Sequence, residues 1–285
     1  MRYAFIGAQR GAFPVRVLCA VLGVSRSGFY RWRRQPVGRR QRRREQLAAR
    51  IRRVHQRSRG VYGSPRVQRA LAAEGEAPCR NTVAAVMKAL GLRGGTRRRR
   101  RARTTTSRPA VAPDLVGRSF RAEGPDRVWT GDITYIPTGE GYLYLAGVLD
   151  LYSRRIVGWS MADHLRQELV VDALKMAVAR RRPAPGLIHH SDRGSQYAAA
   201  AYRRLLARHQ MRQSMSRRGD CYDNAPTESL WSTIKRELIH QRRFRTRREA
   251  RAAVFEYIEV FYNRRRIHSR LGYLSPEAFE ARGGA

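Results

Sequence analysis

The chain is short of cysteine, of lysine and of acidic residues. Its three cysteines, Cys19, Cys79 and Cys221, are unevenly spaced and form no C-x-x-C pair, which argues against a disulfide framework and against a cysteine zinc site. Thiols that stay free are typical of a reducing compartment. No segment approaches the roughly 20 apolar residues that span a bilayer, and the N-terminal apolar stretch is too short for a secretory signal. We therefore expect a cytoplasmic protein with no membrane association.

The scarcity of acids leaves a strongly positive chain. It has 22 Asp and Glu against 59 Lys and Arg, a formal net charge of +37 and a pI near 11.7. All but three of the basic residues are arginine, whose planar fork suits phosphates and guanine edges. A highly charged solvated surface or a codon-usage bias would give similar counts. The self-repulsion nevertheless favours a polyanionic partner, and we expect that partner to be DNA.

The length of 285 residues and the hydrophobic content of 42% are enough for a folded core and for more than one domain. Residues 1–36 are interpreted as a helix-turn-helix-like segment. An apolar stripe with helical spacing precedes Gly23, and Ser25 is placed to cap a second helix that mixes aromatic residues with cations. Such a helix can present cations to DNA, although an ordinary helical hairpin with an aromatic core is the alternative. The cations expected to contact DNA are Arg26, Arg31 and Arg33.

Residues 47–92 predict a second helical, helix-turn-helix-like DNA-binding domain. A helix beginning near Leu47 should follow the basic stretch 39–44, and Ser64-Pro65 should start the next helix. A third helix should complete the domain, and basic edges on helices of this kind suit DNA docking.

Two further basic segments flank the remaining part of the chain. Residues 93–119 lack periodicity and predict a cationic linker, which is either a spacer or a tether along phosphates. Residues 243–285 predict a C-terminal helical extension that packs on the preceding domain and carries a basic loop. The cations expected to contact DNA in these two segments are Arg97, Arg98, Arg99, Arg100, Arg101, Arg264, Arg265 and Arg266.

Residues 120–242 change to the pattern of strands. Three segments rich in β-branched and aromatic residues follow one another across short turns, and then come a helix, a short strand and more helices. This order predicts an α/β core of the ribonuclease-H type behind an all-α N-terminal region. In that arrangement Asp132 lies on the first strand, Asp192 at the end of the fourth and Glu228 in the first turns of a later helix.

These three acids are the candidate catalytic residues. Magnesium is held by one or two carboxylates plus phosphate oxygens, and a pair of such ions clamps both oxygens of an in-line phosphoryl displacement. Carboxylates that converge in an arginine-rich protein therefore indicate chemistry on DNA, with Mg²⁺ or Mn²⁺ as the cofactor, as two ions. A lone Asp in a strand is more often a turn or capping residue, but three acids in distinctive segments reverse that preference.

The same segments resemble a known family. The chain is similar over residues 1–280 to the OrfB transposases of bacterial insertion sequences, in the insertion-sequence family numbered three, whose catalytic domain is similar to retroviral integrase. The stretches that carry the resemblance are V-W-T-G-D-I-T-Y-I-P-T, Y-L-A-G-V-L-D-L-Y-S-R-R-I-V-G-W, H-S-D-R-G-S-Q-Y, S-R-R-G-D-C-Y-D-N-A-P-T-E-S-L-W-S-T-I-K and Y-N-R-R-R-I-H-S-R-L-G-Y-L-S-P.

The resemblance implies a DDE site made by Asp132, Asp192 and Glu228, with the family's spacing of thirty-five residues between the last two. It implies Lys235 as a DNA-contacting residue, on the same helix face as Glu228. The function implied is metal-dependent DNA strand cleavage and strand transfer in a bacterial cell, close to the nucleoid. The partners implied are the DNA at the element's ends, the target DNA, an OrfA protein and further copies of the chain. The chain itself resembles the OrfB portion alone. Gly131 departs from the pattern, because a larger side chain is expected before the first Asp.

Alternatives remain at individual residues and for the whole chain. Asp150 could be a fourth carboxylate at the metal site, although a turn role is favoured, and Asp223 is favoured as a helix cap. His189 and His190 are expected to pack or to form hydrogen bonds, and a serine or tyrosine nucleophile does not fit an acidic triad. The rival functions are a structure-specific nuclease of similar fold, which cuts without joining, and a non-catalytic DNA-binding regulator.

Overall fold

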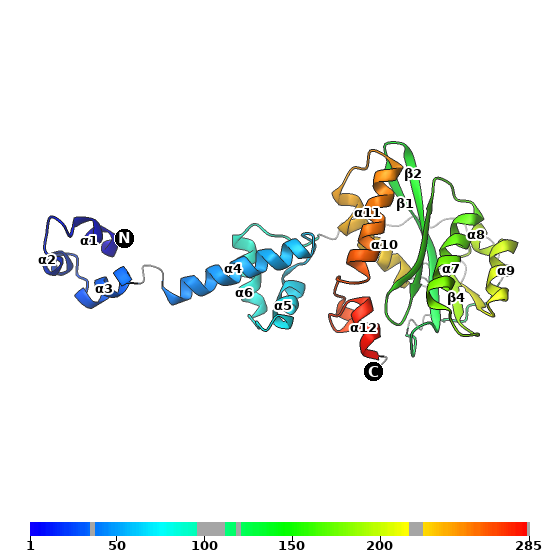
Figure 1. Cartoon of the computed structure of the whole chain (residues 1–285), viewed down its shortest axis with the longest axis horizontal. Helices are drawn as coiled ribbons and strands as arrows, with labels where there is room; N and C mark the ends of the chain where they lie inside the picture. Colours follow the sequence, from blue (N-terminus) through cyan, green and yellow to red (C-terminus); the bar gives the residue numbers. More distant parts are fainter. Residues whose placement is uncertain (35–37, 96–111, 118–120, 217–224, 284–285) are drawn as a thin grey trace. The chain divides into compact units, whose positions relative to one another are not determined.

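The computed structural model describes residues 1–34, 38–95, 112–117, 121–216 and 225–283. The chain forms two compact units, Met1–Gly94 and Gly95–Ala285 (Figure 1). The Arg97–Arg101 cations and Asp223 lie outside the described residues.

The first three helices pack around a small core of their own. They are α1 (Arg2–Gln9), α2 (Val15–Val21) and α3 (Arg26–Arg34), and their core consists of Ile6, Cys19 and Phe29. The chain turns between α2 and α3 at Gly23, whose φ of +61° favours glycine. The Ser25 hydroxyl accepts a hydrogen bond from the Gly28 N–H at 3.0 Å, so the expected cap is present.

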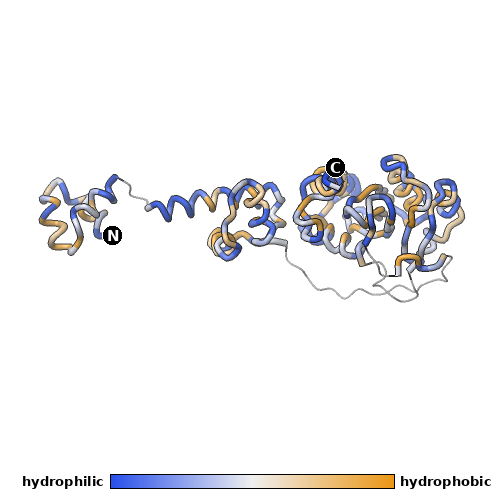
Figure 2. The backbone as a smooth tube through the Cα atoms, turned by 90° about the horizontal axis from the view of Figure 1, so that it is seen from below, coloured by the Kyte–Doolittle hydropathy of each residue, from blue (hydrophilic) through white to orange (hydrophobic). Residues whose placement is uncertain are grey.

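A second helical group follows in the same unit. It consists of α4 (Arg39–Arg57), α5 (Ser64–Ala73) and α6 (Arg80–Ala89), with a core that includes Ile51, Leu71 and Val83. The prediction that the first of these helices begins near Leu47 is wrong, since α4 begins at Arg39. Its first half is uniformly hydrophilic (Figure 2), so it shows no apolar periodicity, yet arginine is a good helix former.

The second unit is built on a five-stranded mixed sheet. The strands β1 (Val128–Thr138), β2 (Gly141–Asp150) and β3 (Ile156–Ala162) form an antiparallel meander, as the sequence pattern predicts. Strand β4 (Ile188–Ser191) pairs parallel to β1, and β5 (Arg212–Met215) pairs parallel to β4, giving the order β3-β2-β1-β4-β5. Strand β5 is not predicted by the sequence pattern, because R-Q-S-M is short and polar and shows no apolar alternation.

Helices cover both faces of this sheet (Figure 1). On one face α7 (Gln167–Arg181), α8 (Ser195–Ala198) and α9 (Ala200–Arg208) enclose the main core, which includes Trp129, Leu174 and Tyr202. On the other face lie α10 (Ala225–Glu237) and α11 (Arg247–Glu256). Side chains alternate along β1, so residues of one parity face α7 and those of the other parity face α10.

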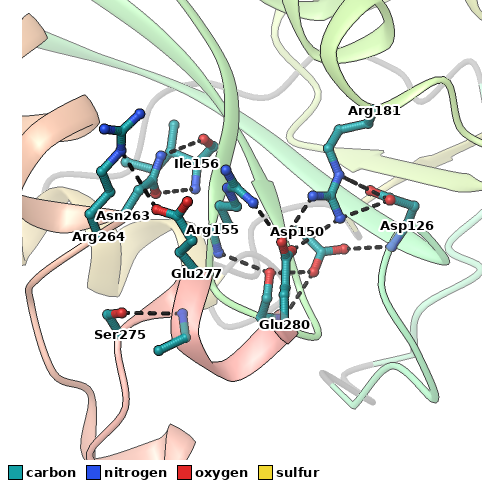
Figure 3. Close-up of polar contacts among 12 residues, drawn as sticks. Asp126, Asp150, Arg155, Ile156, Arg181, Asn263, Arg264, Ser275, Glu277 and Glu280 are labelled. Atoms are coloured by element: carbon teal, nitrogen blue, oxygen red, sulfur yellow. Dashed lines mark hydrogen bonds and ion pairs between the residues drawn. The ribbon is translucent and has the colours of Figure 1, made fainter. Parts of the chain in front are cut away.

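The C-terminal extension packs on this unit, as predicted. Helix α11 continues as a π-helical segment, Tyr257–Tyr262, and α12 (Pro276–Gly283) follows. Arg181, at the end of α7, pairs with Asp126 and with Glu280 of α12 (Figure 3). Asn263 bonds the backbone N–H and carbonyl of Ile156, both at 3.0 Å. The extension is therefore tied to the sheet by polar contacts.

A buried ion pair joins the extension to α10. The Arg266 guanidinium donates two hydrogen bonds of 2.7 Å to the Glu237 carboxylate, and the Tyr257 hydroxyl donates a third at 2.8 Å. The side chains of Arg266 and Glu237 are 3% and 1% exposed. A buried charge is costly unless it is paired and hydrogen-bonded, and these donors supply both for the Glu237 carboxylate.

We expect Arg266→Met to lower the free energy of unfolding by about 3–5 kcal/mol, because it removes the cation that is hydrogen-bonded to the buried Glu237 carboxylate and leaves only Arg236, 3.8 Å away. Urea unfolding of the full chain would measure the loss. Glu277→Gln is the matched control, since it removes the partner of Arg264 from an exposed pair 3.6 Å long and should cost less than about 1 kcal/mol. Equal stability of the two variants would contradict the interpretation.

Candidate active site

Two of the three candidate acids emerge side by side from the centre of the sheet. The parallel pairing of β1 with β4 ends at the partners Gly131 and Ser191. Asp132 is the next residue of β1, and Asp192 directly follows the end of β4. Neighbouring strands lie about 4.8 Å apart, so the pairing brings the two acidic residues together. Asp132 and Asp192 are both partly buried.

A tryptophan of helix α10 connects this helix to Asp132. Trp231 donates its indole N–H to Asp132 Oδ2 at 3.0 Å, and the Ile133 N–H is bonded to Asp132 Oδ1 at 2.7 Å. The ring of Trp231 lies against Gly147, the partner of Asp132 on β2, where a Cβ would come within 2.7 Å of it. The first aspartate is thus fixed between a strand and a helix, while Glu228 is carried in an exposed position in the first turn of that helix.

Asp192 is held by the loop that follows β4. Its Oδ1 accepts a hydrogen bond from the Gly194 N–H at 2.9 Å, and the adjacent Arg193 donates from Nε to the Ser216 carbonyl at 2.7 Å. A carboxylate with one oxygen bonded to the backbone has a restricted orientation, which is the requirement for a metal ligand.

The charges of the three acids influence one another. The pKa of Asp132 is raised to about 7, first by burial and then by the carboxylates of Asp192 and Glu228, while the hydrogen bonds from Ile133 and Trp231 act in the opposite direction. Burial also raises the pKa values of Asp192 and Glu228. This donor set of hard oxygens, with mutual repulsion, fits a divalent cation. Within the part of the chain that the structure describes, however, no three His, Cys, Asp or Glu side chains are gathered closely enough to hold an ion.

A buried cluster of rings in edge-to-face contact lies against Gly131, the residue before the first aspartate. His189 on β4 is fully buried, its Nε2 is 3.0 Å from the Tyr202 hydroxyl, and burial lowers its pKa to about 3. A Cβ on Gly131 would lie 2.9 Å from His189 Cε1 and 3.4 Å from Tyr197 Cε1. The absence of a larger side chain before Asp132 is therefore explained, because the His189 ring occupies that space.

The neighbouring histidine is also internal. His190 Nδ1 lies 2.8 Å from the Ser214 hydroxyl of β5 and its side chain is buried. The expectation that His189 and His190 pack or form hydrogen bonds agrees with these contacts. Asp150 is likewise buried, and it accepts hydrogen bonds from the backbone N–H groups of Asp126 and Ser153 and from the Ser153 hydroxyl. This is the turn role that the sequence favoured.

Lys235 interacts electrostatically with Asp132, and no ion pair joins it to another residue that the structure describes. Its Nζ is 4.6 Å from the centre of the Tyr135 ring. Burial lowers the pKa of Lys235, and the carboxylate of Asp132 acts in the opposite direction. The side chain is only partly buried, so a DNA phosphate could reach its ammonium group.

The other predicted DNA contacts divide between the surface and the interior. Arg26, Arg31 and Arg33 are exposed on α3, and Arg264 and Arg265 are exposed after the π-helical segment. Arg266 is buried against Glu237, so the expectation that it contacts DNA is wrong. In the sequence Arg266 is the last of three consecutive arginines, and no local pattern indicates that its side chain is buried.

Comparisons with known proteins agree with this architecture. Models of the integrase core domain match residues 122–221 and 209–276, and a helix-turn-helix-like domain matches residues 42–101. The chain is 46% identical to the insertion element IS600 uncharacterized 31 kDa protein of Shigella sonnei, over 92% of this chain and 97% of that protein. It is 43% identical to the transposase InsF for insertion sequence IS3A of Escherichia coli K12, over 98% of each. The chain belongs to the IS3 transposase family.

Membership confirms the family resemblance, the integrase-type α/β core and the enzyme class. The protein is a DDE transposase, a polynucleotidyl transferase that acts on DNA. Among solved structures it is similar to the HTLV-2 integrase catalytic core domain in complex with magnesium, at 13% identity and a TM-score of 0.44, over 56% of this chain and 99% of that one. No described helix of the transposase is long and apolar enough to cross a membrane.

The residues that hold the candidate site residues in place were not predicted from the sequence. Trp231 lies three positions after Glu228 on α10, and its place in E-S-L-W-S was the only local signal. The role of Gly147 depends on its pairing with Asp132 across β1 and β2, which no spacing within one strand reveals. The contact of Tyr135 with Lys235 joins a strand to a helix one hundred residues further on.

We expect Gly131→Ala to destabilise the transposase by about 1–3 kcal/mol, because the new methyl group overpacks the His189 ring. Chemical unfolding of the full chain measures the effect. Gly124→Ala is the control, since a Cβ there meets nothing within 4 Å. In a His189→Ala background the Gly131→Ala change should cost clearly less, and an unchanged cost would show that the ring is not the cause.

Proposed function

We propose that Asp132, Asp192 and Glu228 form the catalytic triad of this transposase and hold two divalent ions, Mg²⁺ or Mn²⁺. The observation that supports the proposal is the end of the β1–β4 pairing, where Asp132 and Asp192 lie next to each other. Glu228 in turn interacts electrostatically with Asp132. Ions held by these carboxylates would supply Lewis-acid activation of the attacking hydroxyl and charge stabilisation of the leaving oxygen.

Neighbouring residues of the chain position the carboxylates that would bind the ions. Trp231 and the Ile133 N–H fix the Asp132 carboxylate, and the Gly194 N–H fixes that of Asp192. Glu228 is exposed in the first turn of α10, where it can turn toward a cation placed between the aspartates. We assign Lys235 to a phosphate next to the scissile bond. Catalysis by positioning and charge stabilisation requires no covalent link between protein and DNA.

We expect Asp192→Asn, Asp132→Asn and Glu228→Gln each to reduce strand cleavage and joining by at least about a hundredfold, the scale on which loss of one charge-stabilising group acts. The assay supplies labelled element-end DNA, a free 3′-hydroxyl end and Mg²⁺, and it separates cut from joined products on a gel. Chelation should remove both activities, and Mg²⁺ or Mn²⁺ should restore them.

Asp172→Asn is the control for the triad, since Asp172 is an exposed acid on α7 and should leave cleavage unchanged. DNA binding by the triad variants should stay close to wild type, because phosphate contacts come from the cations. Cleavage retained by Asp192→Asn would refute the assignment. Cleavage without joining would favour the nuclease alternative, and neither activity in the wild-type chain would favour a regulator.

The remaining surfaces are assigned to DNA and to partner proteins. We propose that Arg26, Arg31 and Arg33 on α3, the linker cations Arg97–Arg101, and Arg264 and Arg265 contact phosphates. We further propose that several copies assemble on DNA and that an OrfA protein supplies recognition of the element's ends. The same proposal places the enzyme in the bacterial cytoplasm, close to the nucleoid.

We expect the chain alone to bind DNA with little sequence preference and with an affinity that falls steeply with salt, because phosphate contacts release counterions. Footprinting on element-end DNA and on a scrambled duplex, across a salt series, measures both properties. Addition of the OrfA protein should create a specific footprint. A tight footprint on the element's ends from this chain by itself would contradict the division of labour.

A further inference from the structure

Two tyrosines lie together on the surface at the far end of the β1–β2 hairpin. Tyr135 and Tyr142 are 54% and 52% exposed, and their ring centroids are 5.2 Å apart at 71°. Tyr144 lies directly opposite Tyr135 in the sheet register and packs against the main core. We call Tyr135 and Tyr142 the tyrosine patch.

The patch adjoins the candidate active site. Tyr135 follows Asp132 by three residues on the same strand, about 10 Å along it at the usual rise of a strand. The pairing with β4 ends at Gly131, so beyond that point the described strands leave this edge of β1 uncovered except for a bridge between Thr138 and Phe244. The Asp132 and Tyr135 side chains lie on opposite faces of β1, and the Lys235 side chain, which interacts with both, links the acidic site to the patch around this open edge.

Two cationic side chains lie beside the tyrosine patch. Lys235 Nζ lies 4.6 Å from the Tyr135 ring centre, and Arg247 of α11 donates from Nε to the Tyr142 carbonyl at 3.2 Å. Glu140, an acid nearby in the sequence, accepts a hydrogen bond at 2.8 Å from the backbone N–H of Arg247, the first residue of α11. Exposed aromatic rings with adjoining cations are the combination that binds unpaired nucleotides, since rings stack bases and cations contact phosphates.

Sheet packing alone accounts for only part of this arrangement. Tyr144 has the direct cross-strand position and the core contact, which are the contacts that stabilise a hairpin. Tyr135 and Tyr142 keep more than half of their surface in water and meet mainly each other, Tyr144 and the Lys235 ammonium group. A scattered exposed aromatic needs no explanation, but two in contact beside a cation and an acidic site form a continuous surface.

We propose that the tyrosine patch stacks an unpaired base of the DNA substrate, next to the phosphate bound at Asp132 and Lys235. The proposal rests on the assignment of the active site and adds the form of DNA that it takes. A base within a duplex has both faces covered by its neighbours, so only a base that has left the stack can lie on the rings. The patch would therefore favour DNA that is frayed or single-stranded at the reacting end.

The test measures stacking without catalysis. The full chain is titrated, in the presence of chelator, into a duplex whose two-nucleotide 3′ overhang carries 2-aminopurine, and into a blunt duplex of the same sequence. Wild-type protein should quench the overhang fluorophore as the base stacks. The double variant Tyr135→Leu/Tyr142→Leu should lose the quenching and bind the overhang DNA about tenfold more weakly, as expected for loss of a base–aromatic stack, with blunt-duplex affinity unchanged.

Two controls separate stacking from folding. Tyr135→Phe/Tyr142→Phe keeps the rings and should keep both the quenching and the affinity. Phe255→Leu removes a ring on α11 that is 50% exposed and packs edge-on against Trp159, and it should change neither. Thermal unfolding of each variant checks that the hairpin remains folded.

The outcomes have separate meanings. Quenching and affinity that survive in the leucine variant would overturn the proposal, and so would an equal loss on blunt duplex, which would mark a general docking surface. Loss of both in the phenylalanine variant would also overturn it, because the rings would still be present. Since no divalent ion is needed, a failure of the Asp192→Asn test would remove the triad and leave the stacking result standing.

Discussion

The site depends on like charges that the sheet forces together. Strand β4 pairs with β1 only as far as Gly131 and Ser191. The next residue of β1 and the first residue after β4 are therefore aspartates that lie beside each other. Partial burial removes water that would screen the two carboxylates, and the pKa of Asp132 rises to about 7. The hydrogen-bonded sheet, with a core on one face and α10 on the other, supplies the stability that opposes this repulsion. A divalent cation held by these carboxylates, as proposed above, would relieve the repulsion.

Small residues make this close arrangement possible. Gly131 leaves space for the His189 ring beneath the first aspartate, and Gly147 leaves space for Trp231 above it. The same α10 that carries Trp231 and Glu228 ends at Glu237, which is buried in the pair with Arg266 of the C-terminal extension. The extension thus supports the helix on which the third acid depends. A substitution far from the acids can alter their positions through this connection.

Arginine has two different roles in the chain, and its abundance hides the difference. Arg181 and Arg266 form internal or partly buried ion pairs that attach the extension, whereas Arg26 and Arg264 lie at the surface. The planar guanidinium serves both purposes, since it matches a carboxylate as well as a phosphate. The tyrosine patch adds a further kind of contact, in which aromatic rings lie beside cations near the acids.

The sequence by itself determined the family, the antiparallel meander and the helices with clear apolar periodicity, and it singled out the three acids that are proposed as the catalytic triad. These features rest on local patterns, because side-chain alternation, caps such as Ser25 and distinctive segments such as H-S-D-R-G-S-Q-Y are written within a few residues. Only the tertiary structure decided that Arg266 is internal, that Gly131 accommodates His189, that R-Q-S-M is an edge strand and that Tyr135 meets Lys235. Each of these joins segments distant in the chain, and a residue's burial and partners depend on what the fold places against it.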